Sequence, residues 1–226
     1  MCCESESHCE KGQLERHNTI IDEIVCHLPI AIFSVAMSMV VLSFLYYVNP
    51  AENKLGAYRL FHNFHYLHLL FAATGTVLTF RRYSKNKMLA IIIGFLAPAF
   101  FCTLSDMILP YFSGRLLGVD MSFHWCFVKK LSRVLPFVFA GMLNGWLMAD
   151  HDSNKHLFYS QGFHFLHIFV SAMASILYLV SFGFSNWYNQ IGFVFILLIF
   201  VVLAPCTLSD IVVPMIFARR DKNTKK

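Results

Sequence analysis

Two five-residue motifs of identical sequence place a thiol, hydroxyls and a carboxylate within apolar segments. Cys-Thr-Leu-Ser-Asp occupies residues 102–106 and occurs again at residues 206–210. In both copies a proline follows the aspartate by four residues and an arginine follows it by nine. A carboxylate inside an apolar segment is costly in a membrane and marks a functional site by default. Asp106 and Asp210 are therefore the first candidates for chemistry.

A second duplicated pattern supplies imidazoles. Phe-His-x-Leu-His covers residues 64–68 and 163–167, which gives the pairs His65/His68 and His164/His167. Histidines three residues apart on a helix project from the same side. His62 adds a third imidazole to the first copy only, because a glutamine stands at the matching position of the second copy. We therefore expect His62 to be less essential than the two pairs.

The duplicated motif should also bring thiol and carboxylate together. Cys102 and Asp106 are four residues apart, as are Cys206 and Asp210, so each pair shares a helix face. Because proline has no N–H, Pro110 should leave open the carbonyl four residues back, which is that of Asp106. We expect two pseudo-symmetric sites, one displaced toward each face of the membrane. They would merge into one cluster if they lay near its middle.

Such a set of donors is typical of a transition-metal site. Two histidines with a carboxylate suit Zn, Fe, Mn, Co or Ni, and an added thiolate favours Zn or Cu. The predicted ligands are His65, His68, Asp106, His164, His167 and Asp210, with Cys102 and Cys206 as ligands or as inert core residues. Haem is the weaker alternative, because two histidines on one helix cannot ligate opposite faces of one ring. One histidine from each of two helices still could.

Other interpretations remain open at the level of sequence. The aspartates could accept hydrogen bonds from the histidines and only pin helices together, or the two groups could relay protons without a metal. A metal could instead serve redox or hydrolytic chemistry. The sequence contains no zincin helix, nucleophile elbow, P-loop or dinucleotide fingerprint. Enzyme activity therefore ranks below transport, and a role as accessory subunit of a membrane complex ranks third.

The composition indicates a membrane protein. Of the 226 residues, 57% are hydrophobic and only 14% are charged, and the mean hydropathy is +0.58. These values are too apolar for a soluble domain, so the lipid bilayer is the expected partner. The net charge of +5 is not gathered on a basic helix, which argues against nucleic-acid binding. Seven scattered cysteines do not form a disulfide framework.

Six segments are long and apolar enough to cross a hydrocarbon core of about 30 Å as helices. We expect an all-α polytopic protein with one membrane domain, a polar N-terminal tail and a basic C-terminal tail. Most Lys and Arg residues outside the spans fall on the side that holds both termini, which predicts cytoplasmic termini. The spans are expected at 27–48, 60–80, 88–112, 131–149, 157–182 and 189–216, the tails at 1–26 and 217–226.

The landmarks recur in the same order in two halves, at about 27–115 and 131–219. Each half holds three spans, and an odd number places the second half upside down relative to the first. Inverted repeats of this kind are shared by many transporters. Both copies keep every letter of the motif, whereas catalysis needs only one competent site. The sequence therefore predicts a transporter of a transition-metal cation or of protons, alone, as an oligomer or within a larger complex.

Overall fold

The computed structural model describes residues 20–48, 53–126, 130–150, 156–184 and 187–224. Within these ranges all regular elements are helical, which confirms the all-α prediction. The α-helices are α1 (Ile20–Val48), α2 (Asn53–Tyr83), α3 (Lys87–Thr103), α4 (Leu109–Leu116), α6 (Leu131–Asp150), α7 (His156–Phe182), α8 (Ile191–Thr207) and α9 (Val213–Thr224). Two π-helical turns, η1 (Leu104–Ile108) and η3 (Leu208–Val212), and one 3₁₀ turn, η2 (Trp187–Gln190), complete them.

Among the described residues, five helical stretches are long and apolar enough to cross a membrane, which supports an integral multi-pass membrane protein. They are Leu28–Val48, Lys87–Leu116, Leu131–Asp150, Gly162–Phe182 and Trp187–Asp221. Their outer surfaces carry exposed apolar side chains suited to lipid, among them Phe44, Phe100, Leu143, Phe193 and Phe200.

The sixth expected span lies in α2, which is long enough but more polar than the others. Its 31 residues extend over about 46 Å. The helix contacts α3, α6, α7 and α9, so the other helices enclose it. Its polar side chains, including His65, His68, Thr74 and Thr76, are almost fully buried against protein rather than exposed to lipid. This central position explains why α2 lacks the apolar composition of a lipid-facing helix.

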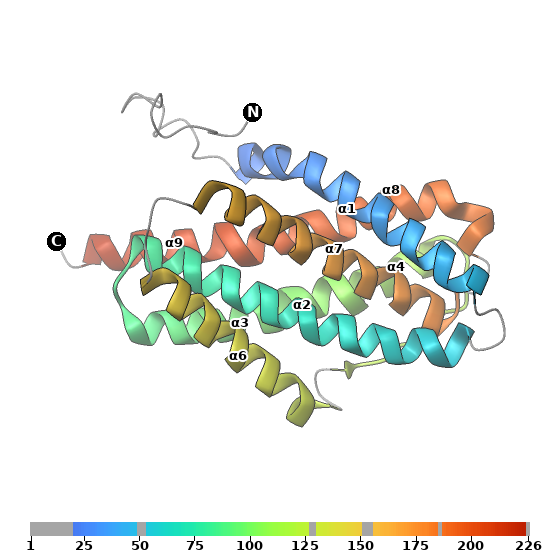
Figure 1. Ribbon diagram of the computed structural model, residues 1–226, viewed down its shortest axis with the longest axis horizontal. Coiled ribbons are helices and arrows are strands. Elements are labelled where there is room, and N and C mark those ends of the chain that lie inside the picture. Colours follow the sequence, from blue (N-terminus) through green and yellow to red (C-terminus); the bar gives the residue numbers. More distant parts are fainter. Residues whose placement is uncertain (1–19, 49–52, 127–129, 151–155, 185–186, 225–226) are drawn as a thin grey trace.

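Successive helices cross the bundle in opposite directions (Figure 1). In that view α1, α7 and the stretch from α3 to α4 run toward the right, whereas α2, α6 and the stretch from α8 to α9 run toward the left. Helix α1 begins and α9 ends toward the same end of the bundle. Helix α1 therefore runs opposite to α6, α2 opposite to α7, and the stretch from α3 to α4 opposite to that from α8 to α9.

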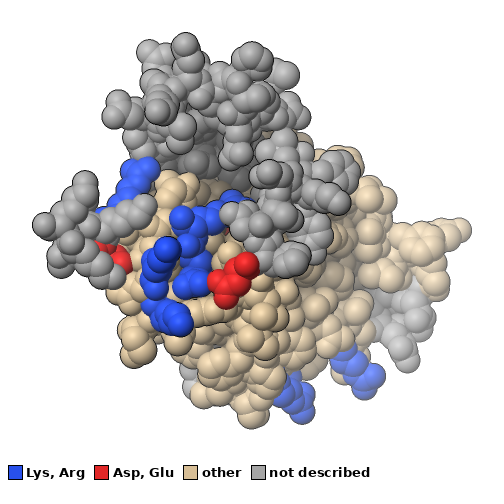
Figure 2. Space-filling view, turned by 60° about the vertical axis from the view of Figure 1, so that its left-hand side comes forward, with Lys and Arg blue, Asp and Glu red and all other residues tan. Residues whose placement is uncertain are grey.

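The end of the bundle where α2 finishes is basic. Figure 2 turns this end toward the viewer and shows several Lys and Arg side chains close together. Asp221 of α9 fastens the turn between α2 and α3, because it accepts hydrogen bonds from Ser84 Oγ (2.5 Å) and Asn86 Nδ2 (2.8 Å). Helix α9 extends to Thr224 and so includes most of the segment expected to be a C-terminal tail, residues 217–226. Basic residues at this end are Arg81, Arg82, Lys87, Arg219 and Arg220.

Glycines allow α6 to lie directly against α2. A Cβ atom added to Gly145 would lie 2.5 Å from Thr74 O, and one added to Gly141 would collide with Leu70 O. Thr74 Oγ1 also donates a hydrogen bond of 3.0 Å to Gly141 O. Small residues at a helix crossing permit this close backbone approach, which is common in membranes.

Contacts between helices fall into matched sets. The contact of α1 with α7 corresponds to that of α6 with α2, and the contact of α2 with α3 corresponds to that of α7 with α8. Likewise α2 touches η3 as α7 touches η1, and α3 touches η3 as α8 touches η1. Exchanging α1, α2 and α3 for α6, α7 and α8 therefore reproduces these neighbours, with α2 and α7 packed together between them.

Candidate metal centre

Asp106 receives two imidazoles from α2. The Nδ1 atoms of His65 and His68 each lie 2.8 Å from Asp106 Oδ2, and all three side chains are at most 1% exposed. A carboxylate is an acceptor, so each Nδ1 carries a proton and donates it. The Nε2 atoms therefore face away from Asp106 with their lone pairs available. A carboxylate that orients an imidazole in this way is typical of histidines that bind metals.

Two hydroxyls complete the surroundings of this carboxylate. Ser105 Oγ donates a hydrogen bond of 2.9 Å to Asp106 Oδ1, and Ser171 Oγ of α7 donates a longer one of 3.4 Å to the same oxygen. Asp106 thus has partners from α2, from its own turn and from α7. These contacts fix its position between the two halves of the chain.

His68 Nε2 faces two thiols, one from each half. Cys206 Sγ lies 3.5 Å and Cys102 Sγ lies 3.7 Å from this nitrogen. The ring of His167 lies beside it, with ring centroids 4.8 Å apart. The ligand atoms of His68, His167 and Cys206 all lie within 4.8 Å of one another. Tetrahedral Zn²⁺ with usual Zn–N and Zn–S bonds would hold N and S about 3.6 Å apart, which matches both distances.

The second half presents a similar pair with less complete hydrogen bonding. His167 Nδ1 lies 2.6 Å from Asp210 Oδ2, but the two groups are not aligned for a hydrogen bond. Within the described residues, both oxygens of Asp210 and Nε2 of His167 and of His65 are buried without a hydrogen-bond partner. Buried polar atoms normally find partners. Several such atoms at one centre form a set of donors that a bound cation would satisfy.

The π-helical turns explain what the prolines do. In η1 the N–H of Leu109 bonds to Leu104 O, five residues back. Pro110 therefore leaves open the carbonyl of Ser105, not that of Asp106 as expected from α-helical spacing. Ser175 Oγ of α7 donates to this Ser105 O at 3.0 Å. The extra residue of the π turn is the physical reason for the shift.

The second π turn repeats this arrangement. Thr76 Oγ1 of α2 donates to Ser209 O at 3.0 Å, and Pro214 is the proline that leaves this carbonyl open. Thr76 follows His68 by eight residues, as Ser175 follows His167. A hydroxyl from each half thus donates a hydrogen bond to the backbone carbonyl that the proline leaves open in the π turn of the other half. These two hydrogen bonds place Asp106 and Asp210 at equivalent points beside α7 and α2.

The structure brings most of the predicted site residues to one place. His65, His68, Cys102 and Asp106 lie together, and Cys206 and His167 meet them directly; Asp210 adjoins His167. His164 lies farther out: it is half-buried, and its ring centroid is 6.3 Å from that of His167.

The expected pair of separate sites is therefore one centre. Helix α2 begins at Asn53, well before the expected start of the span near residue 60. This earlier start places His68 at the midpoint of α2, fifteen residues from each end. The histidines thus reach the middle of the bundle, where the two halves meet, instead of lying toward one face.

The geometry argues against a haem between the two facing histidines. Axial ligation would require the macrocycle to lie between the rings of His68 and His167. Rings with centroids 4.8 Å apart leave no space for a porphyrin between them. Thiols and imidazoles in direct contact instead suit a single small cation.

Sequence reasoning missed the supporting hydroxyls and a second donor cluster. Ser171 and Ser175 follow His167 at intervals of four residues on an apolar helix, so helical spacing alone could have placed them on the functional face. The second cluster joins His62 to His124 and Cys126. No spacing rule connects a helix residue to a loop some sixty positions later. Only the fold shows this cluster.

Comparisons with known proteins find no relative. No family model matches the chain, and no curated protein and no solved structure matches it either. The functional conclusion therefore depends on the geometry of the buried donors and on the apolar helices around them.

Proposed function

We propose that this chain binds a soft transition-metal cation at the centre formed by His68, His167, Cys102 and Cys206, and carries it across the membrane. One observation supports this most directly. Nε2 of His68 faces two thiols at metal-ligand spacing while its Nδ1 is held by Asp106. Helix pinning alone would use the His–Asp contact but gives no reason for two thiols to meet the opposite nitrogen.

In this proposal the aspartates are positioning residues rather than ligands. Asp106 orients His68, and Asp210 lies 2.6 Å from Nδ1 of His167. Two thiolates and two imidazoles suit Zn²⁺ or Cu⁺ better than Mn or Fe, which prefer harder oxygen donors. Two thiolates also neutralise a divalent cation, which lowers the cost of holding it in a low-dielectric environment.

Transport is the finer part of the proposal, and the duplicated architecture supports it. We infer that the halves are inverted repeats, because matching helices run in opposite directions and have matching neighbours. The hydrogen bonds of Thr76 and Ser175 across the interface are matched too. A centre at the meeting point of inverted repeats is where alternating access would operate. The basic end of the bundle would face the cytoplasm together with both termini.

A resident metal centre is the second candidate, and burial favours it. His68, His167, Cys102 and Cys206 are each at most 2% exposed. Closed sites with four protein ligands are typical of structural zinc, whereas catalytic zinc sites keep one position open for water or substrate. Redox or hydrolytic chemistry would require an opening of this centre.

Flux measurements separate these candidates. Purified protein is analysed for bound metal and reconstituted into liposomes that contain a metal-sensitive dye. Binding with flux supports transport, binding without flux supports a resident centre, and the absence of both refutes the proposal. A metal-independent proton leak would favour the proton relay. Cys206→Ser and His68→Gln should remove metal binding at this centre and, with it, the flux. Ser181→Ala is the control, because within the described part of the chain that hydroxyl donates to its own helix, at Leu177 O (2.6 Å).

A further inference from the structure

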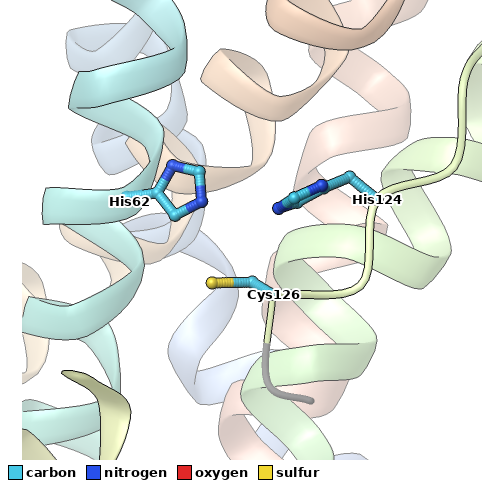
Figure 3. A group of neighbouring side chains, drawn as sticks. All are labelled: His62, His124 and Cys126. Carbon is cyan, nitrogen blue, oxygen red and sulfur yellow. The ribbon is translucent and has the colours of Figure 1, made fainter. Parts of the chain in front are cut away.

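A second cluster of soft donors lies near the α2 N-terminal end of the bundle. Figure 3 shows His62 of α2 directed toward His124 and Cys126, both from the segment that follows α4. Their ligand atoms all lie within 4.8 Å of one another. His62 and Cys126 are 5% and 0% exposed, whereas His124 is half-buried. The cluster is therefore formed inside the fold but lies closer to the surface than the central site.

His62 is prepared to ligate through one nitrogen. Its Nδ1 lies 2.8 Å from the backbone oxygen of Tyr58, and a carbonyl oxygen can only accept a hydrogen bond. Nδ1 therefore carries the proton, and Nε2 keeps its lone pair. Among the described residues this buried Nε2 has no hydrogen-bond partner. Metal-binding histidines commonly have one ring nitrogen fixed by a backbone carbonyl in this manner.

Backbone contacts hold the other two donors in place. The N–H of His124 donates to Tyr178 Oη at 3.1 Å, and the His124 ring stacks on Phe182 with centroids 5.0 Å apart. The N–H of Cys126 lies 3.4 Å from Met107 Sδ, next to the Asp106 turn. The segment is thus fastened to α7 and to η1, so the three donors are brought together before any ligand arrives.

Cys126 is the donor of this cluster that must lose a proton to ligate, because the thiolate rather than the thiol binds metals. A bound cation would displace that proton, and binding would release it to solvent. The single negative charge gained would partly neutralise the cation in this half-enclosed place.

We propose that His62, His124 and Cys126 form a second metal site, which takes a soft cation of the Zn²⁺ or Cu⁺ class. Three protein ligands leave one coordination position open, which is the arrangement of sites that exchange their ligands. His62 precedes His68 by six residues, or about 9 Å along α2. His65, whose buried Nε2 also lacks a described partner, lies between them. Binding here is independent of the central site, whereas a role in loading that site rests on the proposed function.

Metal stoichiometry of the full-length protein in detergent tests the inference. Zn²⁺ titration followed by elemental analysis should find about two ions per wild-type chain and about one in Cys126→Ser or in His62→Gln. Trp125→Phe, which changes the exposed residue between the two loop ligands, should keep both ions. Unchanged binding in both Cys126→Ser and His62→Gln would overturn the second site.

Co²⁺ substitution makes the two sites distinguishable. The thiolate-to-cobalt absorption of the wild type should lose its one-thiolate component in Cys126→Ser and its remaining component in Cys206→Ser. Retained metal at the central site shows that a Cys126 variant is folded. If Cys206→Ser instead changes nothing while Cys126→Ser removes all bound metal, the central proposal fails and the second site stands. If His124→Asn keeps full binding, the three-ligand set is wrong.

Discussion

Replacement of Asp106 by asparagine tests the central chemistry with almost no change in shape. The carboxylate accepts hydrogen bonds from His65, His68, Ser105 and Ser171. Both imidazoles lie on Oδ2 and both hydroxyls on Oδ1, so the amide has two orientations. With its oxygen at the Oδ2 position it still accepts from both imidazoles, but without the negative charge that strengthens His68 as a ligand. With its NH₂ group there, His68 must move its proton from Nδ1 to Nε2 to accept from the amide, and Nε2 can then no longer ligate.

The expected loss of metal affinity follows from the role of Asp106 as the hydrogen-bond partner of a metal-binding histidine. Loss of such a partner usually weakens metal binding about 10- to 100-fold, which corresponds to about 1.4 to 2.7 kcal/mol. Asp210→Asn should cost less, near the lower end of that range, because Asp210 lies beside the imidazole of His167 but is poorly aligned with it, and its oxygens have no hydrogen-bond partner among the described residues. Ser105→Ala removes one hydrogen bond from Asp106 without changing a tautomer. It should therefore cost about 1 kcal/mol of stability and leave the affinity within a few-fold.

Competition against a chromophoric chelator measures the affinity, and thermal unfolding of the metal-free protein measures stability. Asp106→Asn with wild-type affinity but a lower melting temperature would refute the reasoning, because the carboxylate would then only join helices. An equal loss for Asp106→Asn and Asp210→Asn would contradict the asymmetry seen in the hydrogen bonds. If Asp106→Asn cannot be recovered folded, His68→Gln examines the same ligand directly.

Three further predictions concern the packing around this centre. Gly75→Ala should weaken metal binding and lower the melting temperature, because its Cβ would lie 2.6 Å from Asp210 Oδ2; Gly56→Ala on the same helix meets no neighbouring atom and should be neutral or stabilising by up to about 1 kcal/mol. Thr76→Val should cost about 1–3 kcal/mol in chemical denaturation, because the carbonyl in η3 loses its donor; a loss below about 0.5 kcal/mol would mean that water replaces the hydroxyl. Gly145→Ala should force α6 away from α2 at a cost of about 1–3 kcal/mol, and unchanged thermal stability would show that this crossing is loose.

Helices and motif partners could be predicted from sequence, because both depend on local patterns. Apolar length reveals the spanning helices, and the three- and four-residue spacings place His65 and His68 opposite Asp106. The start of α2 could not be located, because residues before 60 are polar and give no apolar signal. The late start placed His68 toward one face of the membrane instead of at the midpoint of the helix. It therefore predicted two separate sites, whereas His68 and His167 lie side by side.

Other features depend on contacts that no local pattern encodes. A π turn has the same letters as an α turn, so the carbonyl opened by Pro110 was assigned one residue too late. The cluster of His62 with Cys126 needs the loop after α4 to fold back onto α2. The polar composition of α2 is likewise explained by the neighbouring helices, which enclose it and shield it from lipid.

Each inserted residue in η1 and η3 also sets the rotational phase of the membrane helix that contains it. One additional residue turns everything downstream by about 100° about the helix axis. The helical segments before and after each π turn consequently direct different faces toward the neighbouring helices, although they form one continuous helix. A single-residue deletion there would make the helix regular, yet it would swing the aspartate or the following proline out of line with its partners in the other half.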